Sequence, residues 1–203
     1  VKYPRTWHLP WSPGATSDDR IISSTDNWIG QEVVITEKMD GENTNMYRDY
    51  IHARSIDYSP HASRSKVKAL HASISHNIPT SWRVCGENLT AVHSIKYTEL
   101  LDFFQVFSIW NEQNVCLSWD DTVLYSSLLE LKTVPVIYRG LWNQEFCEQY
   151  SFDNKTQEGY VVRLAKEFSY RDFSTSVGKY VRASHIQTHG HWMRSKLEFN
   201  SFK

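Results

Sequence analysis

Short apolar and β-branched runs separated by polar turns dominate the chain, and they predict mainly strands. QEVVITE at 31–37 is β-branched, and shorter runs follow at 43–48 and 50–54. Such closely spaced short runs favour an antiparallel meander. Further strands are predicted at 82–89, 103–110, 115–119, 134–138, 158–164 and 176–182.

Helical periodicity is confined to three segments. The first begins at Ser63 or Ser65 and ends near Asn77, before Pro79, with apolar positions at Val67, Leu70, Ile74 and Ile78. The second opens at Asp120 and Asp121, and its predicted apolar side holds Val123, Leu124, Leu128 and Leu131. The third is a short helix near 143–149. With strands in excess, the pattern predicts an α+β fold.

The chain shows no internal repeat and no linker that would divide it, so we expect one domain over 1–203. Residues 1–20, rich in Pro, Trp and Ser, predict an ordered but largely irregular lead-in. Within it, Trp7, His8 and Trp11 around the segment HLPWSPG have two open interpretations. They form one wall of a ligand pocket, or they plug the base of a sheet.

Composition indicates a globular protein and bears on the cellular compartment in which it is expected. The 203 residues are 40% hydrophobic and 22% charged, which suits a domain with its own core. No run of about 18 apolar residues is present and the N-terminus lacks a signal segment, so we expect no membrane contact. The cysteines, Cys85, Cys116 and Cys147, lie too far apart for a disulfide framework or a structural zinc site. A reducing, cytoplasmic location is the resulting expectation.

Charge is distributed unevenly although the formal net charge is only −1. Residues 1–154 carry 13 Lys and Arg against 19 Asp and Glu, whereas residues 155–203 carry 9 against 4. The basic end also contains His185, His189 and His191. Basic segments bind phosphate backbones, so this end permits a nucleic-acid partner without identifying one.

The densest polar cluster is EKMDGEN at 37–43, directly after an apolar strand. Lys38 at the end of a strand, beside a glycine turn, can present its amine to a cleft as a nucleophile or phosphate ligand. Taken alone, this segment is better explained as a charged hairpin turn with Lys38 in solvent. Further polar residues follow in order within or beside predicted strands: Arg54, Glu87, Glu158 and Lys179.

These segments together resemble the covalent nucleotidyltransferase superfamily, and most closely the phage-type RNA ligase 2 family. The segments that carry the resemblance are EKMDGEN, HARS, VCGENL, FFQVFSIW, EGYVVR and GKYVR, within roughly 30–195. The resemblance implies a nucleotidyltransferase (ATP-grasp-like ligase) domain with two antiparallel sheets, flanking helices and the nucleotide in the cleft between the sheets. It also implies an ATP-dependent RNA ligase that uses Mg²⁺, with Mn²⁺ as an alternative.

The first three of these segments, EKMDGEN, HARS and VCGENL, imply the nucleophile and the contacts to the nucleoside. Lys38 is the lysine that becomes adenylylated, with Glu37 near the adenine and Asn43 at the spacing found in RNA ligases. Arg54 lies beside the nucleotide sugar or the RNA end. Glu87 then binds the ribose hydroxyls.

The other three segments, FFQVFSIW, EGYVVR and GKYVR, imply the contacts to the adenine ring, the metal and the phosphates. Phe107 stacks on the adenine, and Glu158 organises the metal. Arg163 contacts a phosphate, and Lys179, with Arg182 in support, binds the phosphates. The expected partners are RNA ends with a 5′-phosphate and a 3′-hydroxyl, bound by a monomer.

The chain departs from the family pattern in two places. Ser108 stands where the family usually has an aspartate after the aromatic residue, and the positions flanking Lys179 that would hold a second lysine are Val177 and Val181. Because few residues follow GKYVR, we also expect no OB domain. Alternatives are an ATP-dependent DNA ligase, a capping-type enzyme that uses GTP, and a non-catalytic module that binds RNA ends.

The proposed nucleophile needs help from its surroundings. A lysine with an ordinary pKa of about 10.4 is protonated at neutral pH, and lowering the pKa to about 7 corresponds to roughly 4–5 kcal/mol. We expect Lys179, Arg163 and Mg²⁺ to supply the positive potential. We also expect Lys38→Ala to abolish adenylylation and leave the fold intact, because a cleft lysine supports little core packing.

Overall fold

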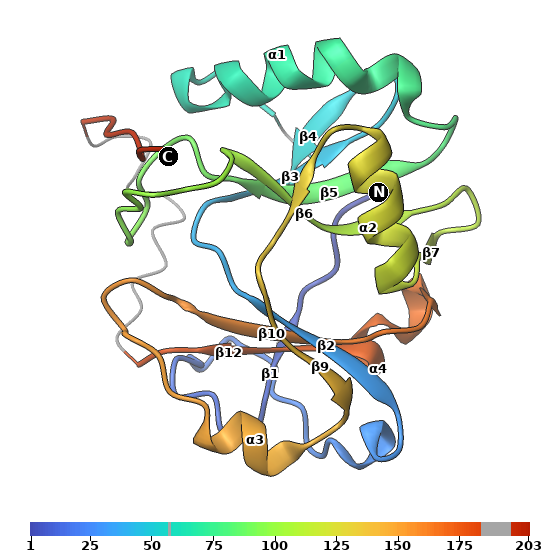
Figure 1. Cartoon of the computed structure of the whole chain (residues 1–203), viewed down its shortest axis with the longest axis vertical. Coiled ribbons are helices and arrows are strands. Elements are labelled where there is room, and N and C mark those ends of the chain that lie inside the picture. Colours follow the sequence, from blue (N-terminus) through green and yellow to red (C-terminus); the bar gives the residue numbers. More distant parts are fainter. Residues whose placement is uncertain (57, 184–195) are drawn as a thin grey trace.

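The protein, represented by a computed structural model that describes residues 1–56, 58–183 and 196–203, is built on two facing sheets (Figure 1). Sheet A has the order β1-β12-β10-β2-β9, and the seven-stranded sheet B has the order β11-β7-β6-β5-β3-β4, with β8 beside β6. Strand pairs are antiparallel except β1 with β12 and β6 with β8. The predicted α+β class with two sheets is therefore confirmed.

The elements follow the predicted segments closely. Sheet A comprises β1 (Trp7–His8), β2 (Glu32–Glu37), β9 (Val136–Leu141), β10 (Gly159–Leu164) and β12 (Val177–Val181). Sheet B comprises β3 (Glu42–Met46), β4 (Ile51–Ala53), β5 (Arg83–Asn88), β6 (Phe104–Trp110), β7 (Val115–Cys116), β8 (Lys132–Thr133) and β11 (Phe168–Ser169). The helices are α1 (Ser65–Ile74), α2 (Trp119–Leu128), α3 (Gln144–Gln149) and α4 (Phe173–Ser176), with short 3-10 turns at η1 (Asp26–Trp28), η2 (Ala62–Arg64), η3 (Ser75–Asn77) and η4 (Tyr170–Asp172).

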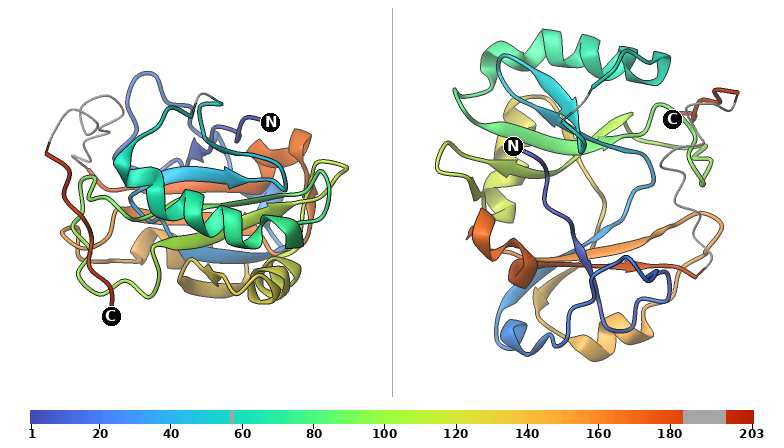
Figure 2. Two further views of the ribbon diagram at one scale, coloured as in Figure 1. Left: turned by 90° about the horizontal axis from the view of Figure 1, so that it is seen from above. Right: turned by 180° about the vertical axis from the view of Figure 1, so that it is seen from behind.

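The helices cover the outer faces of the two sheets. In both views of Figure 2 and in Figure 1, α1 lies over sheet B, and α3 lies on the far side of sheet A. Val67, Ile74 and Ile78 are buried against sheet B, as the helical spacing predicts. A second core, which includes Trp28 and Tyr160, packs on sheet A. The space between the sheets is lined by both polar and apolar side chains.

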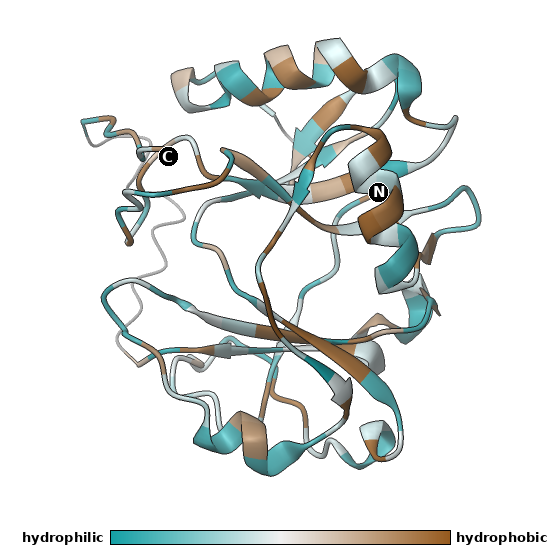
Figure 3. Cartoon of the chain, in the orientation of Figure 1, coloured by the Kyte–Doolittle hydropathy of each residue, from teal (hydrophilic) through white to brown (hydrophobic). Residues whose placement is uncertain are grey.

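Helix α2 does not face the core in the predicted way. Val123, Leu124 and Leu128 are 42%, 53% and 66% exposed, whereas Trp119, Thr122 and Ser126 are buried; the apolar colour along α2 is visible in Figure 3. Ser118 caps the helix by accepting a hydrogen bond from the Asp121 N–H. Trp119 packs inward at the first turn, and this fixes the rotation of the helix. The buried hydroxyl of Ser126 donates to the Thr122 carbonyl, so the small polar residues are satisfied inside.

The N-terminal lead-in is more regular than predicted. Its residues Trp7–His8 form β1, which extends sheet A, and the Ser12 hydroxyl accepts from the N–H of Val181 in β12. Trp11 stacks on Trp142 and its Nε1 donates to the Tyr160 hydroxyl. Of the two interpretations of HLPWSPG, the structure supports the one in which these residues plug the base of a sheet.

The chain end described at 196–203 packs on the segment that links β5 to β6. The buried Asn200 side chain accepts from the Tyr97 N–H and donates to the carbonyls of Leu89 and Ala91. The three C-terminal histidines noted in the sequence lie outside the described residues. Across the part of the chain that the structure describes, no helix is long and apolar enough to cross a bilayer.

Candidate active site

A cavity of about 580 Å³ lies between the two sheets, and nine of the ten predicted site residues line it. The segment from the end of β2 to the start of β3 crosses from sheet A to sheet B through this cavity. Gly41 is required in that crossing, because a Cβ there would lie 2.4 Å from the Asn88 carbonyl oxygen. The lining residues among the predictions are Glu37, Lys38, Asn43, Arg54, Glu87, Phe107, Glu158, Arg163 and Lys179.

Lys38 lies at the centre of the crossing and is paired with Glu158. Its Nζ is 2.8 Å from both carboxylate oxygens of Glu158. Burial alone would lower the pKa of Lys38, but the negative charges of Glu158 and Glu87 outweigh burial and raise the pKa. Among the described side chains the carboxylates therefore dominate, and the expected lowering of this pKa by Lys179, Arg163 and Mg²⁺ together stays a prediction. Lys38 is held as an ammonium by a buried carboxylate.

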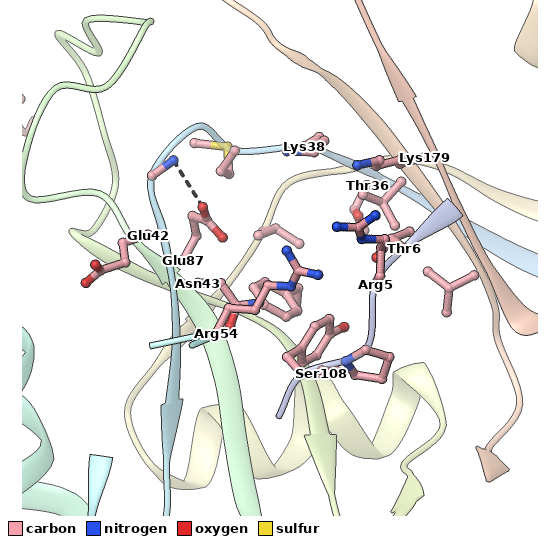
Figure 4. Close-up of a pocket in the computed structure, with 18 of the residues that line it drawn as sticks. Arg5, Thr6, Thr36, Lys38, Glu42, Asn43, Arg54, Glu87, Ser108 and Lys179 are labelled. Atoms are coloured by element: carbon pink, nitrogen blue, oxygen red, sulfur yellow. Dashed lines mark hydrogen bonds between the residues drawn. The ribbon is translucent and has the colours of Figure 1, made fainter. Parts of the chain in front are cut away.

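Glu87 anchors the crossing segment from the sheet B side. Its Oε1 accepts a hydrogen bond from the Gly41 N–H at 3.0 Å, drawn as a dashed line in Figure 4. Burial raises the pKa of Glu87 to about 8, and the charges of Glu158 and Asp40 add to this effect while Lys38 opposes it. Glu87 is thus a carboxyl whose charge depends on the cations near it.

Lys179 is the second lysine of the cavity. It lies opposite Val161 in the β10–β12 pair, and in Figure 4 its amine points toward the same space as Lys38. Its pKa is lowered to about 8, mainly by burial and next by the charge of Lys38, whereas Asp19 and Glu158 oppose the shift. An anion that enters the cavity would favour the charged form of Lys179.

Asn43 and Arg54 lie side by side on β3 and just after β4. The Arg54 N–H donates to the Asn43 carbonyl, and the Asn43 side-chain oxygen accepts from the Asn45 amide at 2.8 Å. Burial lowers the pKa of Arg54, and the charge of Arg5 lowers it further. Both side chains belong to the sheet B wall of the cavity.

Phe107 and Glu37 are the two residues expected to contact the adenine ring of the nucleotide. The half-buried Phe107 ring packs edge-to-face on Tyr3 with centroids 5.3 Å apart, and Glu37 ends β2 with a pKa raised by burial. Next to Phe107, the Ser108 hydroxyl accepts from Trp110 Nε1 at 3.1 Å. The position that departs from the family pattern is therefore buried and hydrogen-bonded, and it also lines the cavity.

Two predicted phosphate contacts are placed differently. Arg163 is buried, and its guanidinium donates to the carbonyls of Leu164 and Leu117 at 3.0 and 2.7 Å. Arg182 does not line the cavity, and its guanidinium contacts the Asn154 carbonyl. These contacts hold both side chains to the main chain, but each guanidinium has further N–H groups, so the phosphate contacts implied by the resemblance stay predictions.

Asp40 and Arg5 also line the cavity, although neither is among the predicted site residues. Asp40 is buried, and its Oδ2 accepts from the N–H groups of Ser94 and Ile95 at 2.8 and 2.7 Å and from the Ser94 hydroxyl at 2.8 Å. Asp40 lies two residues after Lys38 in the EKMDGEN segment, and this position is the sequence signal that could have identified it. Arg5 reaches the cavity from the N-terminal arm and belongs to no motif, so only the fold reveals it.

The carboxylates of the cavity fit a magnesium ion that is shared with a substrate. Within the described ranges, no group of three or more metal-ligating side chains forms a complete site. Mg²⁺ usually takes one or two carboxylates and fills its other positions with water and phosphate oxygens. Glu158 and Glu87, which both line the cavity, can supply those carboxylates.

Comparison with known proteins gives one family. A family model described as RNA ligase matches residues 31–181, and no curated protein matches the chain. Among solved structures, a mutant of Naegleria gruberi RNA ligase with ATP and Mn is 16% identical with a TM-score of 0.55, covering 77% of this chain and 51% of that one. An apo mutant of the same ligase is 16% identical with a TM-score of 0.57, and the match covers 88% of this chain and 56% of that one.

A putative ATP-dependent DNA ligase from Aquifex aeolicus is 18% identical with a TM-score of 0.56 and covers 88% of this chain and 49% of that one. These likenesses establish a shared fold. The chain spans about half the length of the solved structures it resembles.

Proposed function

The chain belongs to the RNA ligase family, and from this premise we propose that it is an ATP-dependent RNA ligase that joins RNA ends through a lysyl-AMP intermediate. The observation that supports the proposal most directly is the convergence of Lys38 and Lys179 on one cavity whose other walls carry Glu87, Glu158 and Phe107. Structures of Naegleria gruberi RNA ligase, which shares this fold, were determined with ATP and Mn and with pyrophosphate, which supports ATP as the substrate and a divalent metal as the cofactor here.

In the first step, the Lys38 amine attacks the α-phosphorus of ATP. A bond forms between Nζ and phosphorus, the bond to the β-phosphate oxygen breaks, and pyrophosphate leaves. The amine must first lose a proton, and the charge of Glu158 opposes this loss. A bound Mg²⁺ held by Glu158 would supply positive charge that weakens this opposition and stabilises the phosphates.

The other cavity residues orient the nucleotide and stabilise its charge. Phe107 offers a flat apolar face for the base, and Lys179 offers an ammonium for the phosphates. In the second step, a 5′-phosphate of RNA takes the AMP from Lys38. In the third, a 3′-hydroxyl attacks the activated end, a phosphodiester forms and AMP leaves.

Intact-protein mass spectrometry tests the proposal. We expect incubation with ATP and Mg²⁺ to add one AMP to the wild type and nothing to Lys38→Ala, and GTP to add nothing. An adduct with GTP instead would indicate a capping-type enzyme. Joining of 5′-phosphorylated DNA in preference to RNA would indicate a DNA ligase, and no adduct with either nucleotide would favour a module that only binds RNA ends.

A further inference from the structure

The N-terminal arm contributes to the cavity although it precedes the region that the family model matches. Residues 2–6 line the cavity, and the matched region begins only at residue 31. Among them is Arg5, whose side chain points into the cavity in Figure 4. The arm therefore adds a cation that the motifs of the family do not include.

Hydrogen bonds tie the arm to the strand that carries Lys179. His8 pairs with Lys179 in the parallel β1–β12 register, and the Leu9 N–H donates to the Lys179 carbonyl at 2.7 Å. Beyond this, the buried His8 ring contacts the Ser12 hydroxyl at 2.8 Å, and that hydroxyl also accepts from Val181. The HLPWSPG plug thus fixes the position from which Arg5 reaches the cavity.

Arg5 and Arg54 approach one another from opposite walls. Figure 4 shows both guanidinium groups in the space beside Lys179, Arg5 from the arm and Arg54 from the sheet B side. Arg5 uses one nitrogen on the main-chain carbonyl of Asp18 at 3.0 Å. Within residues 1–56, 58–183 and 196–203, no carboxylate forms a salt bridge with either group.

Two adjacent guanidinium groups without a counter-ion repel each other, and the charge of Arg5 lowers the pKa of Arg54 accordingly. The planar forks of arginine match phosphate oxygens in bidentate geometry, and three cations from separate elements define a specific position. An anion placed between them would remove the repulsion and satisfy the remaining donors.

We propose that Arg5, Arg54 and Lys179 form a phosphate-binding subsite that the N-terminal arm completes. The subsite rests on the proposed function in one respect: its ligand is a phosphate group other than the one attacked by Lys38. Two sources share this chemistry, the pyrophosphate part of ATP and the 5′-phosphate of the RNA end. In either case Arg5 holds the group in place and takes no part in bond making.

Direct binding measurements test the subsite independently of catalysis. Isothermal titration calorimetry of the wild type gives the reference affinities. The probes are inorganic pyrophosphate and an oligoribonucleotide that carries or lacks a 5′-phosphate. Loss of charge-assisted hydrogen bonds predicts that Arg5→Ala weakens binding of at least one phosphate probe roughly ten- to a hundredfold. Arg5→Lys should recover only part of this, because lysine lacks the fork.

Arg20→Ala is the matched control, because Arg20 lies on the same arm over the Trp7 ring and does not line the cavity. It removes the same charge and should leave both affinities unchanged. Weakened pyrophosphate binding alone assigns the subsite to ATP, and weakened binding of the 5′-phosphorylated RNA alone assigns it to the RNA end. Affinities of Arg5→Ala within twofold of the wild type for both probes, or a wild type that binds neither, would overturn the proposal.

The Lys38 adduct is measured on the same samples. A missing adduct with intact Arg5-dependent pyrophosphate binding refutes the ligase proposal and leaves the subsite standing. A normal adduct with Arg5-independent binding refutes the subsite alone. Melting temperatures of Arg5→Ala and of the size-preserving Arg5→Gln confirm that the exposed Arg5 side chain is dispensable for folding.

Discussion

The two carboxylate oxygens of Glu158 lie 2.8 Å from the Lys38 amine, and this pair joins the ends of two neighbouring strands. Strand β2 ends at Glu37, β10 begins at Gly159, and Glu37 is paired with Tyr160 in the antiparallel register. The register therefore brings the residues that follow and precede these strands together. Both residues lie just outside the two strands, and both line the cavity.

This pair changes what is expected of Lys38→Ala. The variant still loses adenylylation, but it also leaves the carboxylate of the buried Glu158 without its cation, which we expect to cost about 1–2 kcal/mol of unfolding free energy. Urea unfolding provides the measurement. Lys96→Ala, which removes a lysine from an exposed ion pair, should cost less than about 1 kcal/mol. Glu158→Gln added to Lys38→Ala should restore part of the loss; a Lys38→Ala variant as stable as the wild type would show that the cavity solvates the carboxylate.

Phosphate binding should depend on pH through Lys179. Its pKa is lowered to about 8, so the ammonium is complete well below pH 8 and is lost as the pH rises through that value. We expect pyrophosphate affinity to fall above pH 8 by at most roughly tenfold per pH unit. Lys179→Arg keeps its charge in this range and should flatten the profile. Glu87, whose pKa is raised to about 8, gains negative charge over the same range, so Glu87→Gln separates its contribution.

Much of the site was predictable because each catalytic candidate lies within or directly beside a strand with a clear pattern. Lys38 follows an apolar strand and Glu87 lies within one, and the crossing between the two sheets brings both to one cavity. Arg163 shows the limit of this reasoning. A cation inside a strand signals a special environment, but the sequence does not reveal whether its donors face a ligand or, as here, the carbonyls of Leu117 and Leu164.

Arg163 should therefore behave as a structural residue. Removing its guanidinium in Arg163→Ala leaves the Leu117 and Leu164 carbonyls without a donor and a space between the Trp119 and Phe168 rings, at a cost of about 2–4 kcal/mol. Arg163→Lys should recover less than half, because a lysine cannot reach both carbonyls in the same geometry. Urea unfolding gives these values. A stable Arg163→Ala that binds pyrophosphate poorly would restore the phosphate contact implied by the family resemblance.

Asp40 should control the shape of the segment that follows β5. Three donors from Ser94 and Ile95 converge on its Oδ2, so Asp40→Ala leaves two buried N–H groups without acceptors and should cost about 2–3 kcal/mol. Hydrogen exchange of the amides at 94 and 95 should accelerate in the same variant. The exposed Asp49 provides the control, with Asp49→Ala expected within about 0.5 kcal/mol of the wild type. Unchanged exchange at 94 and 95 would mean that other contacts hold this segment.

Helix α2 provides the sharpest test of the difference between pattern and structure. Periodicity alone places Leu124 and Leu128 in the core, whereas the capping by Ser118 and the inward Trp119 turn them to the surface. Leu124→Gln and Leu128→Gln should each change the unfolding free energy by less than about 0.5 kcal/mol, because neither exposed side chain leaves a cavity. Trp119→Ala, in contrast, should cost about 3–5 kcal/mol. Equal losses for the leucine and tryptophan variants would mean that the helix is rotated in solution toward the orientation that the sequence pattern favours.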